Sequence, residues 1–158
     1  MLYALLKAVH LVSLVVWVGG MFFTLACLRP ALGLLDGPLR LRLMHEVMRR
    51  FFDVVSIAIG LMLVSGAWML WLAVRASTPP GLTFNMPLDW LAMIVLGLVM
   101  IAVFGHIRFN LFKRLRVAVQ AQDWPAGAAA LGGIRRWVTV NLVIGVAVIA
   151  LMRLGAAS

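Results

Sequence analysis

The sequence predicts an all-α membrane protein, a bundle of four transmembrane helices with short amphipathic helices on the cytoplasmic side. The 158 residues are 65% hydrophobic and only 12% charged, whereas a soluble domain is about half apolar and a quarter charged. Four stretches lack Asp, Glu, Lys and Arg, namely 8–28, 54–74, 90–107 and 137–152. The first three are long enough to cross a bilayer core as helices, and Arg153 can snorkel at the end of the shorter fourth.

The first two predicted helices are joined by an amphipathic segment. The first covers residues 3–28 and ends before Pro30, because proline cannot continue a helix. Residues 37–52 mix leucine, methionine and arginine, which predicts an interfacial helix leading into the second transmembrane helix at 52–74. We expect all four helices to form one domain, residues 1–158.

The third and fourth helices follow the same logic. The third is expected at 89–107, continuing on the cytoplasmic side to about residue 122. Asp123–Pro125 predicts a new helix start, because proline is favoured in the first turn. Gly132–Gly133 then predicts a hinge into the fourth helix at 136–155.

The basic residues are distributed unequally between the two sides of this topology. Eleven of the 14 Lys and Arg residues lie in the segments joining helices 1 to 2 and 3 to 4. By the positive-inside rule that side is cytoplasmic, so both termini face the periplasm of a bacterial inner membrane. Topology therefore accounts for the net charge of +9, and the predicted partner is the lipid bilayer and not nucleic acid.

Small and polar residues recur at helical spacing within the apolar stretches. In the first helix His10, Ser13, Trp17, Gly20 and Thr24 are spaced by three and four residues, which places them on one face. Such residues gather where membrane helices pack closely, so this face predicts a helix–helix contact. The predicted packing positions over the whole chain are Ser13, Trp17, Gly20, Thr24, Gly60 and Gly145.

His10 is an ionisable residue inside an apolar stretch. Such residues are costly in hydrocarbon and point to a functional site, as a ligand or in proton handling. The alternative is a neutral histidine hydrogen-bonded to a neighbouring helix or to water. Counting along the helices places Met69, Met93 and Met152 near its depth, and imidazole with thioethers suits Cu(I) or haem iron. Methionine is also a common gap filler, so these three residues also fit a packing role.

The other two histidines lie at the opposite side. His45 and His106 are both expected at the cytoplasmic boundary, roughly 20 Å from His10, so they cannot share a metal with it. They predict a second, cytoplasmic-side metal site. The alternative for each is a solvated interfacial histidine.

Charged and polar residues also gather at the cytoplasmic ends of the second and fourth helices. They predict ion pairing that anchors one helix to the other, or arginines that bind an anionic group such as a propionate. The sequence carries no soluble-enzyme signature, and it leaves open whether the protein is an enzyme. The residues of this group are Arg49, Arg50, Asp53, Arg136 and Asn141.

Three stretches together resemble the copper-resistance protein D (CopD) family of bacterial inner-membrane proteins. They are KAVHLVSLVVWVGGMFFTLACLRPAL, RRFFDVVSIAIGLMLVSGAWML and IRRWVTVNLVIGVAVIAL. The resemblance implies a bundle-interior site that handles copper or binds haem, with His10 as the primary ligand. It is compatible with a periplasmic partner that supplies copper or exchanges electrons, and with a homo-oligomer.

The Lys-Ala-x-His lead and Val-Trp-x-x-Gly core also resemble the HemJ-type protoporphyrinogen oxidases, which are haem-binding helical bundles. That resemblance implies oxidation of protoporphyrinogen IX with a bound haem b. The chain departs from that family where it has VTVNLV in place of Asn-Glu followed by Pro, and it has no lysine before His106. A third interpretation is a membrane scaffold or assembly subunit without a site of its own.

Overall fold

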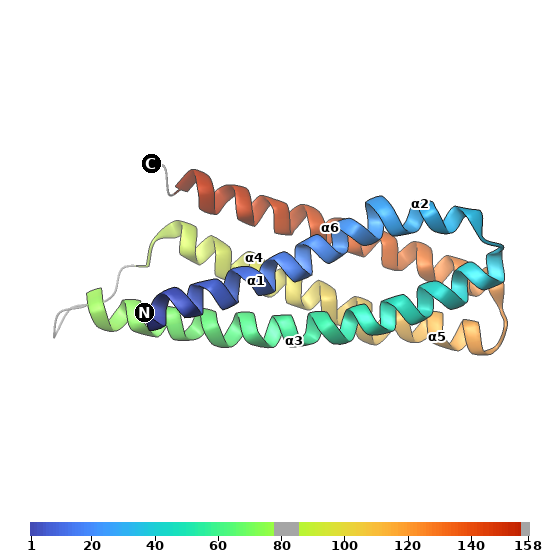
Figure 1. Cartoon of the computed structure of the whole chain (residues 1–158), viewed down its shortest axis with the longest axis horizontal. Coiled ribbons are helices and arrows are strands. Elements are labelled where there is room, and N and C mark those ends of the chain that lie inside the picture. Colours follow the sequence, from blue (N-terminus) through green and yellow to red (C-terminus); the bar gives the residue numbers. More distant parts are fainter. Residues whose placement is uncertain (78–85, 156–158) are drawn as a thin grey trace.

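The computed structural model describes residues 1–77 and 86–155, and nearly all of them are helical. Figure 1 shows long helices lying side by side, with the beginning of the first helix and the end of the last helix at the same end of the bundle. Four helical runs are long and apolar enough to cross a membrane. The predicted class, an all-α polytopic bundle, is confirmed. The four runs are Leu2–Leu34, Gly37–Ala76, Leu88–Gln120 and Trp124–Met152.

The first run does not stop before Pro30. Helix α1 (Leu2–Phe23) continues through the π-helical turn η1 (Thr24–Leu28), the short α2 (Arg29–Ala31) and the 3-10 turn η2 (Leu32–Leu34). Proline lacks the backbone N–H, and its ring crowds the carbonyl four residues earlier. The wider π-helical turn before the proline relieves that crowding, so the helical run goes on for one more turn.

Helix α3 (Gly37–Ser77) unites the predicted amphipathic segment and the second transmembrane helix. Its 41 residues span about 60 Å, roughly twice the thickness of a bilayer core. The charge-free part, 54–74, is therefore the membrane-spanning part, and 37–53 extends beyond the membrane. Continuity is favoured because neither proline nor glycine occurs between residues 39 and 59.

The third run continues beyond residue 107 to Gln120, close to the predicted end at about residue 122. Helix α4 (Leu88–His106) passes through a second π-helical turn, η3 (Ile107–Leu111), into α5 (Phe112–Gln120). The hydrophobic positions of α5 face the bundle, and Phe112 and Leu115 are buried there. The run thus extends the core beyond the predicted membrane boundary.

Helix α6 (Trp124–Gly155) begins where the sequence predicts and continues without a break. Asp123 Oδ1 accepts a hydrogen bond from the backbone N–H of Ala126 at 3.0 Å, which caps the first turn. The expected hinge at Gly132–Gly133 is absent, and both glycines lie inside the helix. The glycine pair lowers helix propensity, but packing of α6 against α4 and α5 outweighs that cost.

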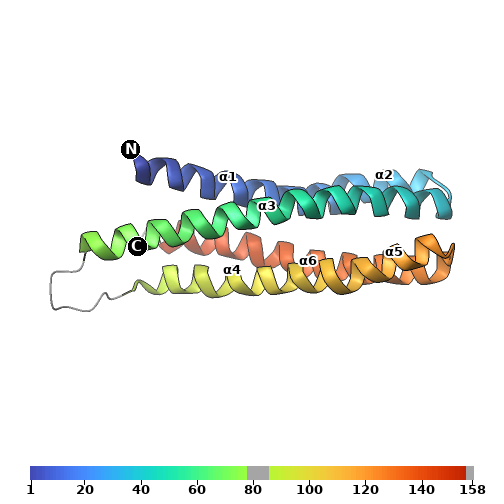
Figure 2. The same ribbon diagram turned by 90° about the horizontal axis from the view of Figure 1, so that it is seen from below.

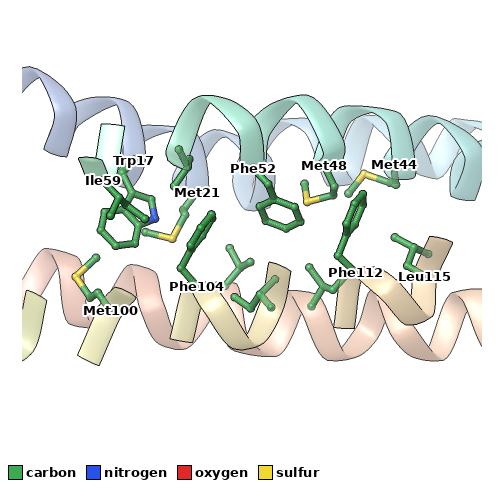
Figure 3. Packing of buried hydrophobic residues seen from close by; sticks show 14 of the residues in the cluster. Trp17, Met21, Met44, Met48, Phe52, Ile59, Met100, Phe104, Phe112 and Leu115 are labelled. Atoms are coloured by element: carbon green, nitrogen blue, oxygen red, sulfur yellow. The ribbon is translucent and has the colours of Figure 1, made fainter. Parts of the chain in front are cut away.

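The helices form two layers, with α1 packed mainly on α3 and α4 packed mainly on α6 (Figure 2). We call the end that holds Leu2 and Gly155 the terminal end. The end that holds η2 and the start of α6 is the basic end. Between the layers lies one cluster of buried side chains. Figure 3 shows its aromatic members Trp17, Phe52, Phe104 and Phe112 facing one another, with T-shaped contacts at 5.2–6.1 Å between ring centroids.

Candidate functional site

His10 of α1 is held against α3. Its Nδ1 lies 3.0 Å from the backbone oxygen of Met62 and 3.3 Å from Oγ of Ser65. Ser65 is buried and donates its own hydroxyl proton to the carbonyl of Leu61 at 2.6 Å. Gly66 makes the close approach of the imidazole possible, because a Cβ there would lie 3.1 Å from Cε1 of His10. The ring therefore has a fixed place between two helices.

These partners determine the tautomer of His10. The Met62 carbonyl can only accept, so Nδ1 carries the proton and donates it. In the neutral ring, Nε2 then carries the lone pair. Histidines that ligate metals almost always donate their other N–H to a carbonyl or carboxylate in this way. His10 is thus hydrogen-bonded to a neighbouring helix, as the alternative interpretation of this residue expects. Its Nε2 remains available to a ligand.

The three methionines predicted near His10 lie on different helices at the terminal end. Met69 is on α3, Met93 on α4 and Met152 on α6, and all three are half-buried. Among the described residues, His10 forms hydrogen bonds to α3 and to no other helix. Within residues 1–77 and 86–155, no three His, Cys, Asp or Glu side chains gather into a metal site.

A close contact fixes the relative depth of the helices. A Cβ on Gly145 of α6 would lie 3.0 Å from Cγ2 of Val18 and 3.1 Å from Cε of Met100. His10 precedes Val18 by eight residues, or about 12 Å. Met93 of α4 and Met152 of α6, both half-buried, each lie seven residues, or about 10 Å, from this contact toward the terminal end. For these two methionines the depth predicted from counting agrees with the helix register.

A second set of methionines, which the sequence prediction did not single out, lies between the layers. Each is at most 8% exposed. Figure 3 shows four of them in the space between the two layers, among the aromatic rings. In the sequence these methionines are indistinguishable from ordinary apolar residues of their helices, so no signal could have separated them. In order from the terminal end they are Met62, Met100, Met21, Met48 and Met44.

Asn141 is buried in the middle of this interface at 1% exposure, instead of pairing with charged groups. Its Nδ2 donates to Sδ of Met21 at 3.7 Å. Its Oδ1 is buried and has no hydrogen-bond partner among the described residues. A buried acceptor without a partner is costly, so this amide lowers the stability of the layer interface.

The ion pairs differ from the predicted ones. Asp53 Oδ1 pairs with Nη2 of Arg108 at 3.0 Å, which ties α3 to η3 and not to α6. Arg49 and Arg50 instead bond Glu46 on their own helix, at 2.7 and 2.8 Å. The i,i+3 and i,i+4 spacing explains this preference, because those side chains are neighbours on the helix surface.

His45 and His106 contact different aromatic rings. His45 stacks on Phe112 with 5.2 Å between centroids, and His106 meets Trp137 edge-on at 5.3 Å. Phe112 lies six residues, or about 9 Å, beyond His106. The structure therefore does not bring the two histidines together. Burial lowers the pKa of His45, which lies outside the membrane-spanning part of α3, and its Nε2 is buried without a partner among the described residues.

The predicted packing positions separate into two groups. Ser13, Trp17 and Thr24 are buried, and both hydroxyls bond the carbonyl four residues earlier. Gly20 is closely approached, since a Cβ there would fall 2.4 Å from the Phe51 ring. In contrast, Gly60 is exposed and its Cβ position meets no heavy atom within 4 Å. Gly60 thus takes no part in the packing among the described helices.

The fold and the charge pattern define a polytopic helical membrane protein with two packed layers of helices. A comparison with protein-family profiles matches residues 45–154 to the family described as copper resistance protein D, CopD. The match covers more than half of the chain, so the chain belongs to the CopD family. Searches of curated proteins and of solved structures give no significant match. The similarity to HemJ-type enzymes stays a prediction from the sequence.

Proposed function

We propose that this protein handles Cu(I) in the membrane, with His10 Nε2 as its ligand at the terminal end. The observation that carries the proposal is the hydrogen bond from His10 Nδ1 to the Met62 carbonyl at 3.0 Å. It holds the ring in one orientation and leaves the other nitrogen with its lone pair, as in a metal-ligating histidine. Membership of a family named for copper resistance supports copper as the metal.

Thioethers are the other donors available to a soft ion at this site. Cu(I) prefers imidazole and sulfur ligands, and Met93 and Met152 share the depth of His10. The five buried methionines between the layers extend the supply of sulfur toward the basic end. We infer that copper enters at His10 and moves along this interface, passively or with the help of a partner protein.

The positive-inside rule gives the proposed orientation. The basic end faces the cytoplasm of a bacterial inner membrane, and the terminal end faces the periplasm. His10 is then the first ligand that copper from the periplasm meets. A periplasmic copper carrier is the corresponding partner.

The test is Cu(I) binding to detergent-purified protein, measured by competition with a colorimetric chelator. We expect one tight site that His10→Ala removes. His106→Ala is the matched control, because His106 is exposed at the other end of the bundle and should leave binding unchanged. A visible spectrum of the same sample separates the haem alternative, since a bound haem gives a Soret band.

Three results would overturn the proposal. Folded, metal-free protein that takes up no Cu(I) would exclude copper handling at this site. Equal binding by wild type and His10→Ala would place the metal elsewhere. A Soret band lost in His10→Ala would identify haem as the ligand of His10, as the HemJ resemblance implies.

A further inference from the structure

A cavity lies at the basic end of the bundle, far from His10. It has a volume of about 550 Å³, within the size range of small-molecule sites. One wall comes from η1 and the α2–η2 turn, another from the start of α3, and the third from α6. Most of the lining is apolar, with contributions from Leu32, Leu41, Met44, Met48 and Ile134.

The cavity crosses the boundary between apolar and charged sequence. Thr24 and Val138 belong to the charge-free stretches of the first and fourth helices and line the part nearer the membrane centre. Arg29, Arg40 and Arg135 line the same cavity just beyond those stretches. One end of the cavity is thus hydrocarbon-like, and the other carries three positive charges.

The three arginines come from three separate elements, α2, α3 and α6. Each side chain is exposed, and the ion pairs found among the described residues involve none of the three. Arginine guanidinium groups bind phosphate with paired, directional hydrogen bonds. The three arginines therefore bring positive charge to one cavity. No acidic side chain among the described residues forms an ion pair with them.

We propose that this cavity binds an anionic phospholipid from the membrane leaflet at the basic end. The phosphate contacts Arg29, Arg40 and Arg135, and the first part of an acyl chain lies along the apolar wall toward Thr24 and Val138. Basic pockets between transmembrane helices are known to favour anionic head groups. The bound lipid joins α2, α3 and α6, and so links the two layers of the bundle.

The first test compares lipid retention by native mass spectrometry after release from nanodiscs of equal parts phosphatidylglycerol and phosphatidylcholine. We expect wild type to retain phosphatidylglycerol preferentially. The triple variant Arg29→Gln, Arg40→Gln, Arg135→Gln should lower that affinity by about fivefold per arginine, on the order of 100-fold in all. The matched control is Lys113→Gln, Arg114→Gln, Arg136→Gln, which removes the same charge from exposed residues outside the cavity.

A second variant keeps all the charges and fills the part of the cavity beside Arg135. A Cβ on Gly132, which lines the cavity three residues before Arg135, meets no heavy atom within 4 Å, so a side chain there has room to begin entering the cavity. In Gly132→Leu the side chain takes up space next to the arginines that the lipid would occupy, the equivalent of about two methylene groups, which should lower retention about tenfold. Gly60→Leu is the control, because Gly60 also faces open space but lies outside the cavity.

Equal loss of phosphatidylglycerol in the two triple variants would overturn the proposal, because it would show general charge attraction instead of a site. Full displacement of the lipid by inorganic phosphate would also overturn it, since a small-anion site needs no apolar wall. Unchanged retention in Gly132→Leu would place the lipid outside this cavity. Neither experiment involves copper or His10, so this inference stands or falls independently of the proposed function.

Discussion

Replacing Gly145 and Gly60 with leucine in turn tests the packing of the two layers. At Gly145 a Cβ already lies 3.0 Å from Val18 and 3.1 Å from Met100, closer than ordinary carbon–carbon contact. The three further carbons of leucine must push α1 or α4 away from α6, and overpacking of this kind costs about 1–3 kcal/mol. At Gly60 no heavy atom lies within 4 Å, and replacing a helical glycine should gain about 0.5–1 kcal/mol.

The assay is reversible unfolding in mixed micelles with increasing sodium dodecyl sulfate, followed by tryptophan fluorescence. Trp17 is a suitable reporter, because it is 1% exposed and packs on Phe104 across the layer interface. We expect Gly145→Leu to be less stable than Gly60→Leu by about 2–4 kcal/mol. Similar midpoints for the two variants would refute this reasoning, because they would show that α6 is not held at the distance the contacts imply.

Three further predictions concern polar groups. Asp53→Asn should cost less than about 1 kcal/mol of unfolding free energy in the same assay, because its ion pair with Arg108 is largely exposed. Asn141→Leu should stabilise the protein by about 1 kcal/mol, since it removes a buried acceptor without a partner and only a weak bond to the Met21 sulfur; a loss of stability would reveal an unseen partner of Oδ1. Burial lowers the folded pKa of His45, so the unfolded state binds more protons below about pH 6.5 and stability should fall from pH 7 to pH 5. His45→Phe should reduce that slope of the unfolding midpoint against pH, and an unchanged slope would show that another group titrates.

The class of fold and the approximate helix positions could be predicted because they depend on composition along the chain. Long helices without charged residues are not stable in water. The thickness of the bilayer core sets the length that a membrane-spanning helix needs. The details of helix ends could not be predicted in the same way. Pro30 and Gly132–Gly133 are local helix-breaking signals, yet the helices continue through both positions. A π-helical turn and packing against neighbouring helices outweigh those local preferences.

The candidate site could be predicted only in part, for a related reason. Spacing identifies which residues share a face of one helix, but not which helix that face meets. Gly20 and Gly60 both fit the small-residue pattern, and only Gly20 is closely approached by a neighbour. Likewise, Asp53 was expected to pair toward the fourth helix, and η3 brings Arg108 to it instead. His10 stood out because an ionisable group in hydrocarbon needs a partner, and its partner could be found only once α3 was placed beside α1.

The five buried methionines between the layers can be explained by packing alone or by a functional role. The contacts of Met21 distinguish between these two explanations. Methionine fills irregular gaps well, and a gap filler needs no polar neighbour. Met21, however, accepts a hydrogen bond from Asn141, whose own oxygen remains without a partner among the described residues. A core selected only for packing would replace that amide with an apolar side chain, because the unpaired acceptor costs about 1–3 kcal/mol. Departures from good packing are expected at functional positions. The amide therefore favours a role for the layer interface beyond packing, one that the proposed passage of Cu(I) past oriented sulfur atoms would supply.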